Sequence, residues 1–356
     1  MSNTGSSFKK IACCVFGQQR AFPLLLPNYL DYWVSDGSHP HYDWEVDWFC
    51  HTSRVNKTHP HRHESLKQKF NYDMPEVLGD REEYVLRDFL KCKKYKIEEN
   101  YSGLYDIMNK YLPFISDSVQ REYGLQKEEE HLRVLFFHAI YSASRVIKMV
   151  REYENENEFK YDMVFVMRPD VQWIDGSRKP PVEFELIDNV IKEREISYPQ
   201  ITERVMAVGG MHVHSGWGMM SDWYYWGTSD SIQNFALGWT ENLFSLLTWY
   251  TNVERYGLPE FKKSKKWNVF SNKTKQHRMI PILDRLLECL GRRHPLSMDN
   301  NNETLWYTFG EKSFACQMTL NNMTSIHPQM AFKTGILDGD YDLRPMADRY
   351  PIWETK

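Results

Sequence analysis

At the centre of the chain stands Met163-Val164-Phe165-Val166-Met167-Arg168-Pro169-Asp170. Five apolar residues in a row after a charged segment predict a buried strand. Pro169 lacks an N–H for a ladder hydrogen bond and biases Arg168 toward an extended backbone, so the strand should stop there. We expect Arg168 and Asp170 at its carboxyl end, where open α/β sheets bind ligands. Taken alone, the tripeptide is also typical of an ordinary strand end with solvated charges.

Composition bounds the class of protein. The 356 residues are 42% hydrophobic and 26% charged, as in globular proteins, and 12 Trp and 21 Tyr suit either stacking on sugar faces or a large core. A net charge of −4 argues against a nucleic-acid partner. No segment reaches eighteen apolar residues, and the polar amino terminus lacks a signal-type region. These features predict a protein without a membrane span and a cytoplasmic location.

The cysteines favour reduced, packed thiols. They are scattered without a Cys-x-x-Cys pair, and several lie in apolar runs, which is typical of a cytosol-like compartment. The six are Cys13, Cys14, Cys50, Cys92, Cys289 and Cys316.

The chain opens with a first predicted strand, an apolar run that ends at Phe16. Gly17 follows and predicts a turn whose backbone a ligand can approach closely. The next three side chains, Gln18, Gln19 and Arg20, carry amide and guanidinium donors suited to a base, a ribose or a diphosphate.

A second predicted strand runs from Trp44 and ends in His51 and Thr52. A helix predicted over Pro27–Trp33 separates it from the first strand, so the chain begins as a βαβ unit. Residues 64–125 are polar and predict an excursion from the sheet, with helical patches such as Arg81–Tyr95. The alternating histidines of residues 59–63 favour a solvated loop over a metal site.

The clearest predicted helix is Glu128–Tyr153, where apolar residues recur every three or four positions. That face should pack against the sheet. Ser142 and Arg145 lie three residues apart beside the apolar stripe, so they are candidates to flank the crevice that Asp170 enters. A solvated helix face is the alternative for each.

The following part of the chain is rich in aromatic residues. Residues 206–218 form a Gly-rich segment without the setting of a phosphate-binding loop. Asp222 then precedes an aromatic strand, Trp223–Trp226, which could form the wall of a sugar site, with rings for the apolar face and a carboxylate for hydroxyls. The alternative for Asp222 is a turn at a strand start. Ser231–Tyr256 and Met279–Gly291 predict helices, and the tail after them predicts packed irregular structure.

Several of these motifs together resemble a known family. They are a strand ending in Gly17-Gln18-Gln19-Arg20, a strand ending in His51-Thr52, a Tyr-Ser-x-x-Arg helix at 141–145, a Tyr-Asp-x-Val-x-x-x-Arg-x-Asp strand at 161–170, and Asp-x-x-x-x-Gly-x-Ser at 222–229. Their order is similar to that of GT-A-type glycosyltransferases from viral and bacterial surface-polysaccharide gene sets, over roughly residues 9 to 290.

The resemblance implies a GT-A-like, Rossmann-like fold: a mostly parallel sheet flanked by helices. It implies one catalytic domain over residues 9–356, with a nucleotide-sugar-binding half at 9–175, an aromatic-rich acceptor-side half at 176–290 and a packed extension at 291–356. It also implies a UDP- or GDP-sugar donor and a glycan acceptor. Expected donor-site residues are Gly17, Gln18, Gln19, Arg20, His51, Thr52, Ser142, Arg145, Arg168 and Asp170.

Two further roles follow from the resemblance and its chemistry. Asp170 matches the last aspartate of the family's Asp-x-Asp motif, which holds Mn or Mg on the diphosphate. Arg168 occupies the first acidic position and is itself a bidentate donor for diphosphate. Asp222 is the expected base for the acceptor hydroxyl.

Two other functions fit the same sequence. One is a glycan- or nucleotide-binding protein without turnover, which release of nucleoside diphosphate would distinguish. The other is sulfo- or phosphotransfer on glycans, which would favour a phosphate-cradling loop.

Overall fold

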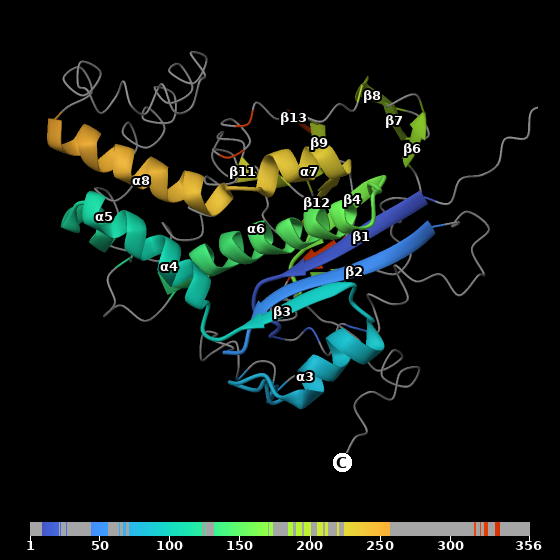
Figure 1. Ribbon diagram of the computed structural model, residues 1–356, viewed down its shortest axis with the longest axis horizontal. Helices are drawn as coiled ribbons and strands as arrows, with labels where there is room; N and C mark the ends of the chain where they lie inside the picture. The colour runs from blue at the N-terminus through green and yellow to red at the C-terminus, as the bar shows by residue number, and fades with distance from the viewer. Residues whose placement is uncertain are drawn as a thin grey trace, which may run out of the picture.

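The computed structural model describes residues 9–20, 22, 26, 44–55, 64, 67, 68, 71–122, 125, 132–169, 171–173, 184–187, 190–193, 196–200, 205–208, 211–212, 219–220, 224–256, 317, 321, 324–326 and 332–334. These residues form an α/β architecture in which helices pack against a central sheet (Figure 1).

The central sheet has seven strands in the order β3-β2-β1-β4-β12-β9-β13. β1 to β4 are parallel, β12 runs antiparallel between β4 and β9, and β13 is parallel to β9. The predicted mostly parallel sheet is therefore confirmed and is compatible with a Rossmann-like fold. The strands are β1 Lys9–Phe16, β2 Trp44–Ser53, β3 Lys94–Glu98, β4 Met163–Met167, β9 Val205–Val208, β12 Tyr224–Gly227 and β13 Thr324–Ile326.

The centre of this sheet is buried on both faces. All five residues of β4 are buried, as the opening stretch predicts. On β1, Cys14 belongs to the core beneath the helices while its neighbour Cys13 points to the opposite face, and both are fully buried. Continuous apolar strands are typical of parallel sheets covered on both faces.

One long helix, α6, lies across β1, β2 and β3 (Figure 1). Its apolar stripe includes Val146, Ile147 and Val150, all fully buried, which confirms the predicted helix over its described part. Burying each such side chain contributes roughly 1.5–3 kcal/mol. The helices are α3 Asp80–Tyr84, the π-helical η1 Val85–Phe89, α4 Ser102–Tyr111, the 3-10 turn η2 Leu112–Phe114, α5 Asp117–Glu122, α6 Leu132–Glu156, α7 Ser229–Ala236 and α8 Trp239–Tyr256.

Smaller strand groups complete the described residues. β5 Val171–Trp173 pairs with β14 Phe332–Thr334, and β10 Met211–His212 pairs with β11 Met219–Met220. A three-stranded group contains β6 Phe184–Ile187, β7 Val190–Glu193 and β8 Ile196–Gln200.

The interpretation of residues 64–125 as an excursion from the sheet is wrong. This segment supplies β3, an edge strand of the central sheet, and α4, which packs against α6 and α8. The predicted helical patch Arg81–Tyr95 also ends early, because Tyr95 belongs to β3. The sequence of β3 shows no apolar run, because Lys94 and Lys96 interrupt it and the strand is only partly buried.

The interpretation of Trp223–Trp226 as a sugar-facing wall is wrong for the described rings. Tyr224, Tyr225 and Trp226 form β12, lie between two other strands and are fully buried, and Trp226 stacks on Phe165 at 5.4 Å between ring centroids. These aromatic side chains build the core and offer no face to a ligand.

Three boundaries also differ from the predictions. The strand Val205–Val208 of the central sheet includes the first three residues, 206–208, of the expected Gly-rich loop, and Thr324–Ile326 of the expected irregular tail is also a strand of this sheet. The predicted helix over Ser231–Tyr256 is two helices, because the chain turns at Gly238 with φ 76°.

Some predictions lie outside the described residues: the helices over Pro27–Trp33 and Met279–Gly291, the histidines of residues 59–63, and Cys289 and Cys316. The four described cysteines are free thiols; three are buried and Cys92 is half-buried, as expected of packed thiols. Within the described ranges, no helix is long and apolar enough to cross a membrane.

Candidate functional site

The candidate site lies where the parallel strands end. The strand order reverses between β1 and β4, because the chain places β2 and β3 on one side of β1 and β4 on the other. In open α/β sheets this reversal opens a crevice outside the carboxyl ends of the strands, where ligands bind. The pairing of Val15 with Met167 brings Gly17 and Arg168 to the same edge.

The turn after β1 presents two buried amides at this edge. Gly17 has φ 96°, a conformation that favours glycine, and its N–H donates to the carbonyl of His51 at 3.1 Å. Gln18 and Gln19 are both buried, yet Gln18 Oε1 and Gln19 Nε2 have no hydrogen-bond partner in the described part of the chain. Buried amide groups usually have partners, so these atoms are candidates for ligand contacts. Arg20 follows with φ 40°.

A buried chain of polar groups backs the turn. His51 Nδ1 lies 3.2 Å from Ser142 Oγ on α6, and His51 Nε2 lies 3.3 Å from Glu98 Oε1 on β3. Burial lowers the pKa of His51 although Glu98 opposes this, so the imidazole is neutral at neutral pH. A neutral ring carries one proton: Nδ1 faces the Ser142 hydroxyl, whereas Nε2 faces Glu98 without a well-aligned hydrogen bond among the described residues.

Glu98 is the charged centre of the cluster. Burial alone would raise its pKa, but His51, Lys96 and Tyr141 contact the carboxylate and hold the pKa at about 2. Tyr141 donates its hydroxyl to Glu98 Oε1 at 2.9 Å, and Lys96 Nζ lies 2.9 Å from the same oxygen. Glu98 Oε2 has no hydrogen-bond partner among the described residues. The site therefore holds a buried negative charge with one uncommitted oxygen.

The turn after β3 is strained where it meets the site. Asn100 and Tyr101 both have positive φ, 47° and 54°, which L-residues adopt rarely. Tyr101 is 1% exposed and stacks on His138 of α6 at 4.0 Å between ring centroids. Strained backbone of this kind persists where packing holds it, and it often marks functional sites.

A glycine allows α4 to approach this cluster. A Cβ on Gly103, in the first turn of α4, would collide with the hydroxyl of Tyr141. The close packing of α4 against Tyr141 therefore requires glycine at this position.

The structure brings most of the predicted donor-site residues to this edge. Gly17, Gln18, Gln19, His51 and Ser142 lie in or directly behind the turn. Burial raises the pKa of Tyr101, and the positive charge of Arg20 opposes this rise. Arg20 therefore lies near Tyr101.

Two predicted donor-site residues are positioned differently from the expectation. Thr52 is fully buried and neighbours His51 on the strand, so it points to the opposite face of the sheet. Arg145 stacks on the ring of Tyr141 at 4.9 Å and lines a separate cavity on the outer side of α6. Thr52 therefore faces away from Ser142, whereas Arg145 lies over Tyr141 and is near enough for its charge to contribute to the lowered pKa of His51.

Arg168 lies where the opening stretch predicts it. It directly follows the last residue of β4 and is half-buried. Asp170 and Asp222, the expected metal ligand and base, lie outside the described residues. The described residues contain no group of three or more His, Cys, Asp or Glu side chains that could hold a metal ion.

Sequence reasoning missed three residues of the site: Glu98, Tyr101 and Tyr141. The signal for Glu98 was the alternation of Lys94-Tyr95-Lys96-Ile97-Glu98, which fits a half-buried edge strand with an acid at its end. Tyr141 precedes Ser142 in the quoted helix motif, but only the structure shows that its hydroxyl reaches Glu98.

Ser142, His51 and Glu98 have the residue types of a hydrolase triad, but their burial argues against that activity. Ser142 and His51 are 0% exposed, so no substrate carbonyl can reach the serine hydroxyl. We interpret the three residues as a support that fixes the carboxyl edge of the sheet.

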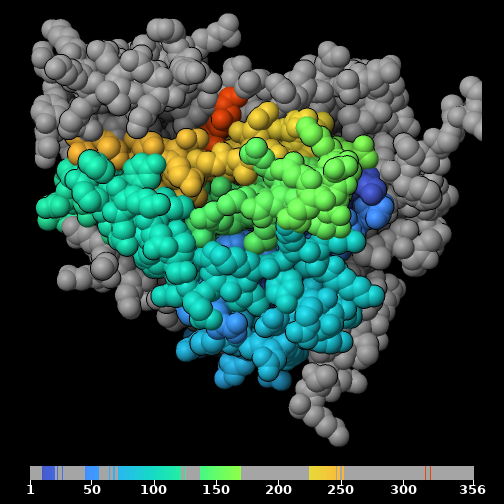
Figure 2. Space-filling view, viewed as in Figure 1, coloured from blue at the N-terminus to red at the C-terminus, as the bar shows by residue number. Residues whose placement is uncertain are grey.

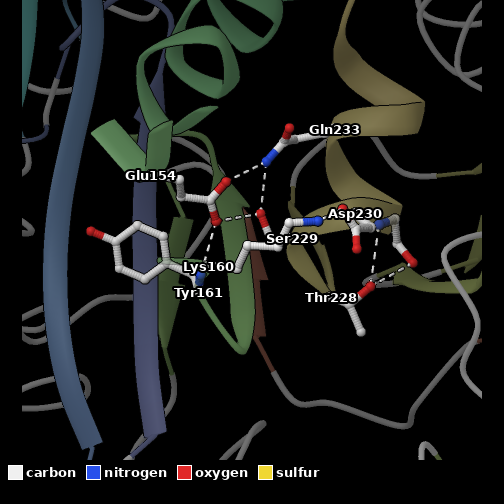
Figure 3. A network of polar contacts seen from close by, with 8 residues as sticks. Glu154, Lys160, Tyr161, Thr228, Ser229, Asp230 and Gln233 are labelled. Atoms are coloured by element: carbon white, nitrogen blue, oxygen red, sulfur yellow. Dashed lines mark hydrogen bonds and ion pairs between the residues drawn. The ribbon is translucent and has the colours of Figure 1, made fainter. Parts of the chain in front are cut away.

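A larger hollow lies at the opposite edge, before β4 begins. It encloses about 680 Å³ and is lined in part by Glu154, Lys160, Asp230 and Gln233. Figure 3 shows that Glu154 accepts hydrogen bonds from the Tyr161 N–H, Ser229 and Gln233, at 2.8, 2.6 and 2.6 Å. The carboxylate is thus committed to joining α6 to β4 and α7, and we assign this edge a structural role.

Comparison with known proteins adds no relative. A scan against protein-family models and a search of curated proteins found no match to this chain.

Proposed function

We propose that the protein is a glycosyltransferase that binds a nucleoside-diphosphate sugar over the carboxyl ends of β1 and β4 and transfers the sugar to a glycan. The observation that carries the proposal is the reversal of strand order between β1 and β4, with the Gly17–Arg20 turn and Arg168 at the same edge. We also propose that the Rossmann-like fold is of the GT-A type and that the protein is cytoplasmic.

Each side chain has a role that its chemistry supports. Gln18 and Gln19 contact the base or ribose through their uncommitted amide atoms. Arg20 and Arg168 bind the diphosphate, whose charge grows as it leaves. Asp170 orients the donor, and UDP or GDP is the nucleotide.

The acceptor reacts from the side of β12. Tyr224 begins β12 and pairs with Met167 at the end of β4, so the antiparallel strand starts at the donor edge. Asp222 stands two residues earlier in the sequence. In the proposed reaction Asp222 takes the proton of the acceptor hydroxyl, whose oxygen bonds to the anomeric carbon. The bond from that carbon to the diphosphate breaks, and the diphosphate keeps the electron pair.

Whether the scheme uses a divalent metal depends on Asp170, which lies outside the described residues. The described residues offer no ligand cluster for one. Mg or Mn on Asp170 would neutralise diphosphate charge, and assays with and without these ions decide whether it contributes.

The experiment is a screen of UDP- and GDP-sugars for release of nucleoside diphosphate, with and without Mg or Mn. We expect slow donor hydrolysis with at least one sugar and its loss in Asp170→Asn, which keeps volume but removes charge. Asp222→Ala should still bind the nucleotide but lose transfer to an acceptor. Binding without any release would favour the non-catalytic binding protein instead, and transfer of a sulfo or phospho group would identify the other alternative.

A further inference from the structure

A second, smaller cavity lies on the outer side of α6. It encloses about 170 Å³ where α4 and the turn between α7 and α8 meet α6. Figure 2 shows the surfaces of these elements adjoining on one face of the molecule. From α6 it is lined by Tyr141, Ser144, Arg145 and Lys148, which the helical period places on one face. The cavity is more than ten times larger than the roughly 10–15 Å³ that one ordered water needs.

The amino terminus of α8 opens into this cavity. Gly238, Thr240 and Glu241 all line it. The first intrahelical bond runs from the Asn242 N–H to the Gly238 carbonyl at 2.9 Å, so the N–H groups of Thr240 and Glu241 precede the bonded ladder. Gly238 has no side chain with which to cap them. Free N–H groups and the helix dipole make such an end favourable for an anion.

A buried hydroxyl gives independent evidence for a ligand. Thr240 is 1% exposed, and its Oγ1 has no hydrogen-bond partner among the residues that the structure describes. Buried polar atoms are nearly always paired, so an orphan hydroxyl that lines a cavity indicates a missing acceptor or donor there.

The charges around the cavity are mainly positive. Arg145 and Lys148 lie one turn apart on α6 and both line the cavity. Arg145 stacks on Tyr141, and within the described part of the chain it forms no ion pair. Lys148 has only an exposed contact with Glu152 at 3.8 Å. Glu241 is the opposing charge.

The carboxylate of Glu241 does not cap its own helix. In α3, Glu82 reaches back to the N–H of Gly79 at 2.8 Å, three residues earlier. Glu241 stands in the same relation to Gly238, yet no such bond is formed among the described residues. The amino terminus of α8 therefore remains open to another anion.

We propose that this cavity is a binding site for a tetrahedral oxyanion, a phosphate or sulfate group. Donors converge on it from two elements: the N–H groups and Thr240 hydroxyl of α8, and the Arg145 and Lys148 side chains of α6. It is separate from the proposed donor crevice, because Tyr141 directs its hydroxyl to Glu98 and its ring to Arg145. The proposal does not depend on the protein being a glycosyltransferase.

The test is calorimetric titration of the full chain with sodium phosphate and with sodium sulfate, at constant ionic strength in chloride. We expect saturable binding that weakens about tenfold or more in Arg145→Gln, which removes a charged donor, and clearly in Thr240→Val, which keeps the branched shape. Glu241→Gln should tighten binding, because it removes the opposing charge.

The control is Arg151→Gln, an equal loss of charge on the same helix outside this cavity, and it should leave phosphate binding unchanged. Thermal melts identify any variant that fails to fold. Tighter phosphate binding by Glu241→Gln would be independent support, because misfolding weakens binding and does not strengthen it. Absence of saturable binding to the wild type, or equal binding by Arg145→Gln and Glu241→Gln, would overturn the site.

A competition arm identifies the source of the oxyanion. If UDP displaces phosphate from the wild type and binds Arg145→Gln more weakly than it binds the wild type, the site takes the phosphoryl group of a nucleotide. If phosphate and sulfate bind while UDP does not compete, the site takes a free oxyanion.

Discussion

His51 near the end of β2 contacts Ser142 in the first half of α6, with 3.2 Å between His51 Nδ1 and Ser142 Oγ, although the two residues are 91 positions apart in the chain. With Glu98 on the other side of the imidazole, this contact joins two strands and the longest described helix at the carboxyl edge of the sheet. A buried polar network therefore lies behind the edge that is proposed to bind the nucleotide. Its contribution to stability and its charge can be tested without any ligand.

Glu98 should make the fold sensitive to acid. Its pKa is held at about 2, below the ordinary value of 4.5, so the folded state binds the proton more weakly than the unfolded state. The stabilisation is complete above pH 4.5 and is lost as the pH falls toward 2. Denaturant melts at pH 7, 4.5 and 3 should show that Glu98→Gln is destabilised at pH 7 and loses less stability than the wild type below pH 4.5. Parallel pH profiles would contradict the assignment.

Gly103→Ala should destabilise the protein. Helix propensity alone would make this change favourable by up to about 1 kcal/mol. The added Cβ collides with the Tyr141 hydroxyl, however, and overpacking of this kind costs about 1–3 kcal/mol. The free energy of unfolding should therefore fall.

The same change in a Tyr141→Phe background is the matched control for Gly103→Ala. Removing the hydroxyl removes the atom nearest the new Cβ, so the cost should be smaller there. An equal cost in both backgrounds would place the strain elsewhere.

Glu154→Gln should weaken the opposite edge of the sheet. The carboxylate accepts three hydrogen bonds and is 3% exposed, and an amide in its place turns one acceptor into a donor that faces donors (Figure 3). We expect a loss of about 2 kcal/mol in the free energy of unfolding. Glu152→Gln, on the same helix but exposed, should change it by less than about 0.5 kcal/mol. Equal effects in chemical denaturation would show that the network contributes little.

The strands with strong apolar runs could be predicted from the sequence. β1, β2 and β4 are five to ten residues long and mostly buried, and their apolar runs pass into polar residues near their carboxyl ends, so the strands and the position of those polar residues could be predicted; their role in binding a donor stays a prediction. The helix α6 was predicted because its apolar period continues over many turns.

The remaining elements depend on tertiary context that the sequence does not display. β3 is an edge strand with lysines, and β13 has only three residues, so neither forms an apolar run. The rings of β12 suggested a sugar site because composition does not show that a strand is covered on both faces. Glu98 and Tyr141 meet across 43 residues, a contact that no local pattern specifies.

The central claim is that the turn after β1 binds a nucleoside diphosphate, and the most direct measurement is calorimetric titration of wild type and Gln19→Leu with UDP and GDP, with and without Mg or Mn. Gln19 is buried with an uncommitted amide nitrogen, so leucine should leave the melting temperature unchanged or raise it. We expect saturable binding of one nucleotide to the wild type and at least about tenfold weaker binding to Gln19→Leu. Failure of both nucleotides to bind the wild type, or equal affinity in the variant, would contradict the account.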